Sequence, residues 1–115
     1  MMKSFTEEFS EDDRLALSQE IMQRYPDRIP IICEPKDTSL TIDKRKFLAP
    51  RDYKVGHFLL TLRRRISNIN SNDALYIFSN NFIPPTGKNI GELYDEMKSK
   101  DGLLYLKFAK ESTFG

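Results

Sequence analysis

The residues of this chain that are best suited to a chemical reaction are the final six, 110–115. They read Lys-Glu-Ser-Thr-Phe-Gly and follow an apolar run over residues 103–109. Gly115 has no Cβ, so its carboxylate can enter a narrow enzyme groove and be activated as an acyl donor to an amine. We therefore predict a conjugation tail at 110–115, in which Thr113 and Phe114 precede the reacting glycine. The alternative is a chain boundary that happens to fall on glycine.

Residues suited to other chemistry are scarce. The chain holds one cysteine, Cys33, in an apolar run, and one histidine, His57, beside an apolar helical stripe. A nucleophile–base pair is conceivable. Free cysteine is among the most buried residue types, however, which favours a core thiol and an ordinary helix-surface imidazole. The sequence has no zinc-ligand spacing and no glycine-rich phosphate loop. We predict a protein that is not an enzyme and has no cofactor and no metal site.

Length and composition narrow the class of protein further. A chain of 115 residues predicts one domain, 1–115, that needs no disulfide to fold. The 18 basic and 17 acidic residues nearly cancel, which argues against a dedicated nucleic-acid binder. A single cysteine agrees with a reducing compartment, and neither a signal peptide nor an apolar run near the roughly 20 residues of a membrane span is seen. These features predict a cytoplasmic protein.

Three helices are predicted from capping residues and apolar spacing. Ser10, followed by three carboxylates, predicts a helix that runs to Tyr25 and stops before a proline. A second helix at 55–66 has the clearest apolar stripe. Asn89 with Glu92 predicts a capping box that opens a short third helix. The predicted stripe of the first helix comprises Leu15, Ser18, Met22 and Tyr25, with Leu17 and Ile21 beside it. The stripe of the second comprises Val55, Phe58, Leu59, Leu62 and Ile66.

Four β-rich runs predict strands at 28–34, 46–49, 74–79 and 103–109. The first contains Pro30, which lacks an N–H and is tolerated only on an edge strand or where that position faces outward. In chain order the elements are helix, strand, strand, long helix, strand, short helix and strand. This order predicts an α+β fold of the β-grasp, or ubiquitin-like, type, in which a mixed sheet wraps one central helix.

Six short sequence motifs are individually common, but their combination in one order is specific. They lie at residues 25–30, 43–50, 55–58, 62–66, 80–86 and 114–115. In this order they resemble the autophagy ubiquitin-like modifier family, which includes GABARAP and the microtubule-associated light chains. The resemblance implies a helical extension of two helices at 1–25, a β-grasp core at 26–109 and the conjugation tail at 110–115.

The resemblance also implies a set of partners. E1-like and E2-like enzymes would activate the tail, and Gly115 would be joined by an amide bond to phosphatidylethanolamine. A cysteine protease would process and deconjugate the protein. The unconjugated form would be a cytoplasmic monomer, and the lipidated form would lie on autophagosome and vesicle membranes. The alternative is an adaptor of the same fold in vesicle trafficking that binds peptides but is never conjugated.

The family binds aromatic-x-x-aliphatic motifs of cargo receptors and adaptors along its second strand, by β-augmentation. By resemblance, the aromatic pocket is lined by Ile21, Pro30, Lys46, Leu48 and Leu103. The aliphatic pocket is lined by Phe47, Pro50, Tyr53 and Phe58. Acidic residues that flank the motif would meet Arg28, Lys44, Lys46 and Arg65. Core packing is an alternative for the apolar members, Leu48 and Phe58 above all. A secondary family surface would comprise Tyr76, Ile77 and Phe78.

Several residues depart from the family pattern. Leu17 stands where GABARAP-like members carry an acidic residue, Thr61 replaces an aliphatic residue near the second pocket, and Ala49 is small. Residues 1–13 hold five carboxylates against one lysine, whereas residues 44–65 hold eight basic residues against one aspartate. We expect the acidic segment either to be repelled by anionic lipid or to fold onto the basic surface at 44–46 and 63–65.

Overall fold

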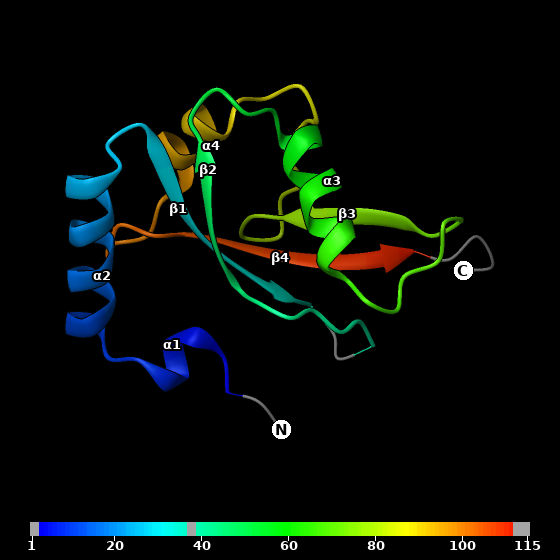
Figure 1. The fold of residues 1–115 in the computed structure, drawn as a ribbon, viewed down its shortest axis with the longest axis horizontal. Helices are drawn as coiled ribbons and strands as arrows, with labels where there is room; N and C mark the ends of the chain where they lie inside the picture. The colour runs from blue at the N-terminus through cyan, green and yellow to red at the C-terminus, as the bar shows by residue number, and fades with distance from the viewer. Residues whose placement is uncertain (1–2, 37–38, 112–115) are drawn as a thin grey trace.

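A four-stranded sheet in the order β2-β1-β4-β3 carries the fold (Figure 1). The computed structural model describes residues 3–36 and 39–111. Every predicted helix and strand is present to within two residues, and the N-terminal extension holds two helices, as the resemblance implied. The elements are α1 (Phe5–Glu8), α2 (Glu11–Arg24), β1 (Arg28–Pro35), β2 (Lys46–Pro50), α3 (Val55–Arg65), β3 (Ala74–Phe78), α4 (Ile90–Met97) and β4 (Leu104–Glu111).

The sheet is mixed, as predicted for a β-grasp fold. β1 pairs antiparallel with β2 and parallel with β4, and β3 pairs antiparallel with β4. Pro30 therefore lies in an inner strand rather than at an edge. Pairing between β1 and β4 begins only at Ile31, so the missing N–H of Pro30 costs that ladder no hydrogen bond. β4 continues to Glu111, which pairs with Ala74 and carries the strand into the segment expected as a tail.

The main core lies between the sheet and α3, with α4 beside it. The predicted stripe of α3 is confirmed, since Val55, Phe58 and Leu62 are buried and Leu59 packs against them. The Phe58 ring meets Phe47 of β2 edge to face, with centroids 5.4 Å apart. Alternate residues of β1 and β4 complete this core, namely Ile29, Ile31, Cys33, Leu104, Leu106 and Phe108.

The opposite face of the sheet is covered by the two N-terminal helices. A second, smaller core there joins Phe5 of α1 to Ile32 and Leu103. The stripe predicted for α2 is wrong in part, because Leu15 and Tyr25 are 38% and 44% exposed and Ser18 is the buried residue of this helix. α2 therefore docks largely through polar contacts.

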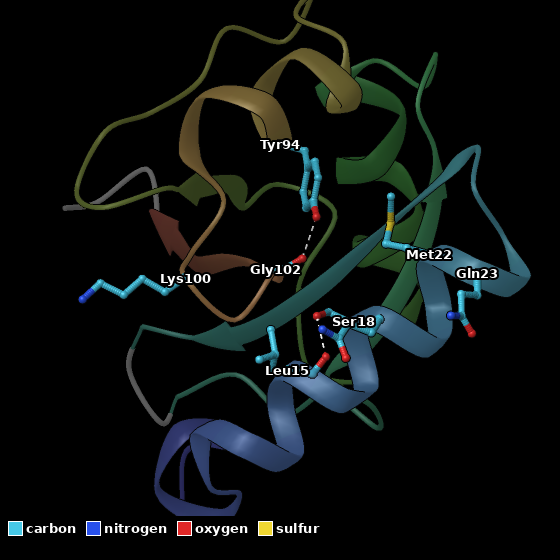
Figure 2. A pocket seen from close by; sticks show the side chains of 8 residues that line it. Leu15, Ser18, Met22, Gln23, Tyr94, Lys100 and Gly102 are labelled. Atoms are coloured by element: carbon cyan, nitrogen blue, oxygen red, sulfur yellow. Dashed lines mark hydrogen bonds between the residues drawn. The ribbon is translucent and has the colours of Figure 1, made fainter.

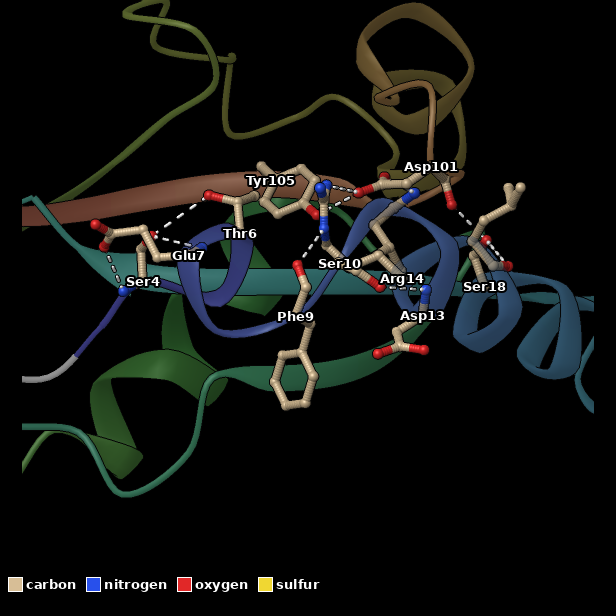
Figure 3. Close-up of polar contacts among 12 residues, drawn as sticks. Ser4, Thr6, Glu7, Phe9, Ser10, Asp13, Arg14, Ser18, Asp101 and Tyr105 are labelled. Carbon is tan, nitrogen blue, oxygen red and sulfur yellow. Dashed lines mark hydrogen bonds and ion pairs between the residues drawn. The ribbon is translucent and has the colours of Figure 1, made fainter.

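Asp101, buried just before β4, is the centre of those contacts (Figure 3). Its Oδ2 accepts hydrogen bonds from Arg14 Nη1 at 2.8 Å and from the Tyr105 hydroxyl at 2.5 Å. Its backbone oxygen accepts from Ser18 Oγ at 2.5 Å. Burial, reinforced by the hydrogen bond to Asp101, raises the pKa of Tyr105 to about 12. One carboxylate thus ties α2 to the sheet.

The helix caps were predicted with mixed success. Ser10 Oγ accepts from the Asp13 backbone N–H at 3.1 Å, so the predicted N-cap of α2 is confirmed. The capping box predicted at Asn89 is wrong: Asn89 is the N-cap residue of α4, but its side chain makes no capping bond. Backbone bridging between Asn89 and Lys54 holds this helix start instead. Within the described residues, no helix is both long and apolar enough to cross a membrane.

Candidate functional site

β2 is an edge strand, and this is the feature on which the candidate site depends. β1 pairs with one side of β2 from Arg28 opposite Pro50 to Ile32 opposite Lys46. Among the described residues, no strand pairs with the other side. Its outward backbone groups can therefore form a ladder with an extended peptide, which would add a fifth strand.

Side chains of β2 alternate between the two faces of the sheet. Lys46 and Leu48 are exposed, whereas Phe47 and Ala49 are 7% and 3% exposed and point into the core. A peptide added to this edge alternates in the same way. Two anchors three residues apart then face opposite sides of the sheet. Aromatic-x-x-aliphatic spacing therefore matches one pocket on the α2 face and one on the α3 face.

On the α2 face, the structure brings most of the predicted aromatic pocket together. Leu48 lies opposite Pro30 in the ladder and is 38% exposed, and Lys46 is its neighbour on the same face. Ile21 is half-buried on α2. Leu103 is fully buried in the smaller core, so it supports this surface from beneath rather than lining it.

On the α3 face, the predicted aliphatic pocket divides into buried and accessible members. Phe58 is 2% exposed and packs against Phe47, so these rings form a base within the core. Pro50 is half-buried and Tyr53 is 38% exposed, and they supply the accessible surface. Core packing, the alternative considered for Phe58, therefore accounts for that residue, whereas Leu48 is exposed.

Next to Tyr53, a shallow depression runs along the outer flank of α3. Its volume is about 270 Å³, and it is lined by Tyr53, His57, Leu60, Thr61 and Arg64. The His57 and Tyr53 rings meet edge to face at 5.5 Å. Thr61, noted in the sequence as a departure, is a half-buried member of this lining.

The predicted cations surround the β2 edge without forming one cluster. Lys44 Nζ lies 4.6 Å from the centre of the Phe47 ring. Arg65 pairs with Asp43 at 3.1 Å, and both side chains are about half exposed. Arg28 stands opposite Pro50, at the far end of the ladder from Lys46. A peptide would therefore meet positive charge at both ends of β2.

Arg45 was not predicted as a site residue, yet it connects the acidic N-terminus to the groove. Its Nη2 lies 2.6 Å from Glu8 Oε2, its Nη1 donates to the Lys3 backbone oxygen at 3.0 Å, and Glu34 lies 3.5 Å away. The guanidinium also lies 5.3 Å from the centre of the Phe5 ring. The opposite charges of the two segments were the signal for this contact, although charge alone did not identify the pair.

The predicted secondary surface is partly buried. Ile77 is 2% exposed and belongs to the main core, so its assignment to a surface is wrong. Strand alternation places Tyr76 and Phe78 on the other face, where Lys36 Nζ lies 4.2 Å from the centre of the Phe78 ring. Only these two aromatic residues remain available from that strand.

A broader hollow lies on the far flank of α2, between that helix and α4 (Figure 2). Its volume is about 580 Å³, and its lining mixes Leu15, Met22, Gln19 and Lys100 with Tyr94. The Tyr94 hydroxyl donates to the Gly102 backbone oxygen at 2.7 Å, so it is already engaged. This hollow is separate from the β2 edge.

The described part of the chain shows no group of side chains arranged for catalysis. Cys33 is fully buried in β1, and desolvation raises the pKa of its thiol well above the ordinary value, while His57 is exposed on α3. No cluster of metal-ligating side chains occurs among the described residues. The predicted tail residues Thr113, Phe114 and Gly115 lie outside those residues.

The chain is similar to known proteins over most of its length. Residues 13–115 match the family model described as "Autophagy protein Atg8 ubiquitin like". Autophagy-related protein 8 of Schizosaccharomyces pombe is 43% identical over 100% of this chain and 96% of that protein, and autophagy-related protein 8i of Arabidopsis thaliana is 42% identical over 99% and 100%.

Two solved structures are also similar. Trypanosoma brucei ATG8 has a TM-score of 0.88 with 32% identity and full coverage of both chains. Plasmodium falciparum Atg8, in complex with a Plasmodium falciparum Atg3 peptide, has a TM-score of 0.84 with 36% identity, covering 96% of this chain and 98% of that one. The agreement extends over the whole β-grasp fold and its helical extension.

Proposed function

This chain belongs to the Atg8 family of ubiquitin-like autophagy proteins. On that premise we propose which of its residues bind motif peptides and which is conjugated to lipid. The protein is a ubiquitin-like modifier of autophagy. Its β2 edge binds aromatic-x-x-aliphatic motifs of cargo receptors and adaptors. Its Gly115 is joined to phosphatidylethanolamine on autophagosomal membranes.

One observation carries the peptide-binding proposal: among the described residues no strand pairs with the outer side of β2, which has an exposed Leu48 on one face and an accessible Tyr53 beside the other. Backbone pairing would supply affinity, and the two faces would select the two anchors. Lys46 and Arg65 would attract acidic residues that flank the motif. Because Arg65 already pairs with the exposed Asp43, its net contribution would be small and would depend on salt.

The conjugation proposal rests on the family and on the tail sequence. The family match extends to residue 115, and residue 115 is a glycine, whose lack of a Cβ suits a narrow acyl-transfer groove. Two acyl chains, at about 0.8 kcal/mol for each buried CH₂, would anchor the protein stably, where one chain would be marginal. Cys33 is fully buried, so it offers no accessible thiol nucleophile for this chemistry, and the chain would act as its substrate.

The proposed enzyme partners also rest on the family to which the chain belongs. The Plasmodium falciparum relative was solved with an Atg3 peptide, and we propose that an E2-like enzyme of that type also binds this chain. An E1-like enzyme and a processing cysteine protease would complete the cycle. The protein would move between the cytoplasm and autophagosome and vesicle membranes.

Calorimetric titration with a Trp-x-x-Leu peptide tests the groove. A Lys46→Ala/Leu48→Ala double variant should lose most of the affinity, because it removes exposed contact surface on the α2 face. Leu15→Ala/Lys100→Ala is the matched control, since Leu15 is also 38% exposed but lies on the far flank of α2. Equal affinity in a folded Lys46→Ala/Leu48→Ala variant would exclude this groove.

A further inference from the structure

The hollow between α2 and α4 is separate from the β2 edge, and no part of the proposed function uses it (Figure 2). We propose that it is a docking site for a partner protein, and that the segment it binds is a short amphipathic helix with acidic residues beside its apolar face. This inference does not depend on the β2 groove or on conjugation. It would give the protein a second interaction surface, distinct from the one that takes extended motif peptides.

The apolar side of the hollow comes from a surface of α2 that its own core does not use. Leu15 and Met22 lie two turns apart on one flank of the helix, with Gln19 between them. Leu15 is 38% exposed and Met22 is half-buried, although both belong to the predicted apolar stripe. α2 is held instead through Ser18 and Arg14. A helix that leaves leucine and methionine outside its own core has apolar surface available to a partner.

The floor of the hollow is fixed by close contacts in the turn after α4. Gly102 lies so near to α2 that a Cβ added there would meet Ser18 Cβ at 3.0 Å. The Tyr94 hydroxyl donates to the Gly102 backbone oxygen, and the Tyr94 side chain is almost fully buried. These contacts hold α2, the turn and α4 together, so the hollow of about 580 Å³ is preformed, as most binding pockets are.

Two lysines give the rim of the hollow its charge. Lys100 lines it, and Lys98 lies in the same turn with Nζ 5.3 Å from the centre of the Tyr94 ring. Both lysines are exposed, and within the described residues the side chain of neither donates a hydrogen bond or forms an ion pair. Two exposed cations without acceptors favour a partner that brings carboxylates.

Carboxylates around the hollow leave this preference in place. Asp95, Glu96 and Asp101 each lie within hydrogen-bond distance of a basic side chain, at 2.7, 2.9 and 2.8 Å. Glu11 and Asp12, in the first turn of α2, are exposed and would repel an acidic segment at that end. The carboxylates of the partner are therefore expected on its side that faces the turn after α4.

The walls of the hollow favour a helix over an extended strand. All of its lining residues come from α2, α4 and the turn after α4, and none belongs to a strand. Strand addition is therefore not available here, and side chains must provide the recognition, as when a helix binds in a groove. α2 and the end of β4 lie at opposite ends of the molecule (Figure 1). A helix bound beside α2 would thus leave the tail accessible.

Calorimetry and NMR with helical peptides of about 16 residues test the inference on the full chain. Each peptide carries apolar residues at i, i+4 and i+7, all Leu, all Met or all Phe, with glutamates beside them, and a matched set replaces the glutamates with lysines. We expect at least one acidic peptide to bind with a Kd of roughly 10–100 µM, through partial burial of its apolar side chains. Its lysine counterpart should bind about ten-fold more weakly at low salt. Amide shifts should change at residues 15–23 and 94–102 and stay unchanged at 46–50.

Variants make the result specific. Leu15→Ala/Lys100→Ala should weaken the acidic peptide about five-fold or more. Leu60→Ala/Lys54→Ala removes an exposed leucine and an exposed lysine from the region of α3 and should leave binding unchanged. No acidic peptide binding more tightly than about 1 mM, equal binding of the lysine set, or shifts at 46–50 in place of the hollow would each overturn the inference.

Sedimentation of the protein alone tests the other occupant, a second copy of the chain. We expect a monomer. A dimer that Leu15→Ala/Lys100→Ala dissociates would mean that the hollow is covered by another copy, and it would overturn docking of a partner helix.

Discussion

At the scale of single residues, burial distinguishes the ion pairs that stabilise this fold from exposed pairs that contribute little. Arg14 meets Asp101 at 2.8 Å with the Asp101 side chain 1% exposed, whereas Arg51 meets Asp95 at 2.7 Å with side chains 39% and 58% exposed. The distances are nearly equal. Desolvation raises the cost of leaving a buried group without its partner, while an exposed pair is screened by water.

Asp101→Ala should therefore destabilise the protein by about 3 kcal/mol, because the buried Leu103 N–H and the Tyr105 hydroxyl both lose their acceptor. Asp95→Ala, the matched control, should change stability by no more than about 1 kcal/mol. Urea denaturation followed by circular dichroism measures both. Equal losses in the two variants would show that the Asp101 contacts do not secure the fold.

The raised pKa of Tyr105 predicts a dependence of stability on alkaline pH. Below pH 10, the ordinary pKa of tyrosine, folded and unfolded chains both keep the phenolic proton. Between pH 10 and about 12 the unfolded chain loses it first, so the free energy of unfolding should fall across that window. Tyr105→Phe should show a shallower fall in denaturation midpoints measured from pH 9 to 12. Parallel profiles would exclude this residue as a cause.

At the scale of elements, α2 is docked by close approach as well as by hydrogen bonds. Gly102 has φ +82°, and a Cβ added there would lie 2.6 Å from Ser18 Oγ. A side chain at this position would strain the backbone and push against α2. At Gly87, by contrast, a Cβ would have no neighbour within 4 Å.

Gly102→Ala should cost about 1–2 kcal/mol of stability and increase hydrogen exchange in α2, because both the left-handed backbone and the contact with Ser18 are compromised. Gly87→Ala should stay within about 0.5 kcal/mol of the parent. Denaturation gives the energies, and exchange mass spectrometry localises the effect. Unchanged exchange in α2 would mean that this glycine does not control docking.

The elements also show how much could be predicted from the sequence. The stripe of α3 and the strand runs come from periodicity, since one apolar face or alternation identifies them locally. α2 was harder, because its buried contact is Ser18 on the Asp101 backbone, 83 residues away in the chain. The burial of Leu103 and Ile77 likewise depends on which sheet face each residue meets. That information comes from tertiary packing and not from local pattern.

At the scale of the whole molecule, the acidic N-terminus is folded onto the basic side of the groove through Glu8 and Arg45. This arrangement corresponds in part to the second of the two outcomes expected for the segment, because the printed contacts reach Arg45, whereas Arg63 bonds to residues 70–73 and Arg65 pairs with Asp43. Deleting the segment would be a poor test of its effect on binding, because Phe5 is 2% exposed and its loss would open the smaller core.

Glu8→Gln is the cleaner variant, since it removes the charge and keeps the helix. Acidic-flanked peptides should bind up to about three-fold tighter at low salt, because freeing one partly exposed cation is worth about 0–1 kcal/mol. The gain should vanish at high salt. Glu20→Gln, on an exposed pair with Arg24 of α2, is the control. Equal affinities for Glu8→Gln and the parent at low salt would reject competition by the N-terminus.

Intact mass of the membrane-associated protein from starved cells tests the central claim, conjugation at Gly115, most directly. We expect the pelleted protein to carry one phosphatidylethanolamine, with fragment ions placing it on the Gly115 carboxylate. Gly115→Ala should leave the protein in the soluble fraction at its unmodified mass. Membrane-bound protein of unmodified mass, or pelleting that persists in Gly115→Ala, would contradict conjugation and leave a peptide-binding adaptor of the same fold.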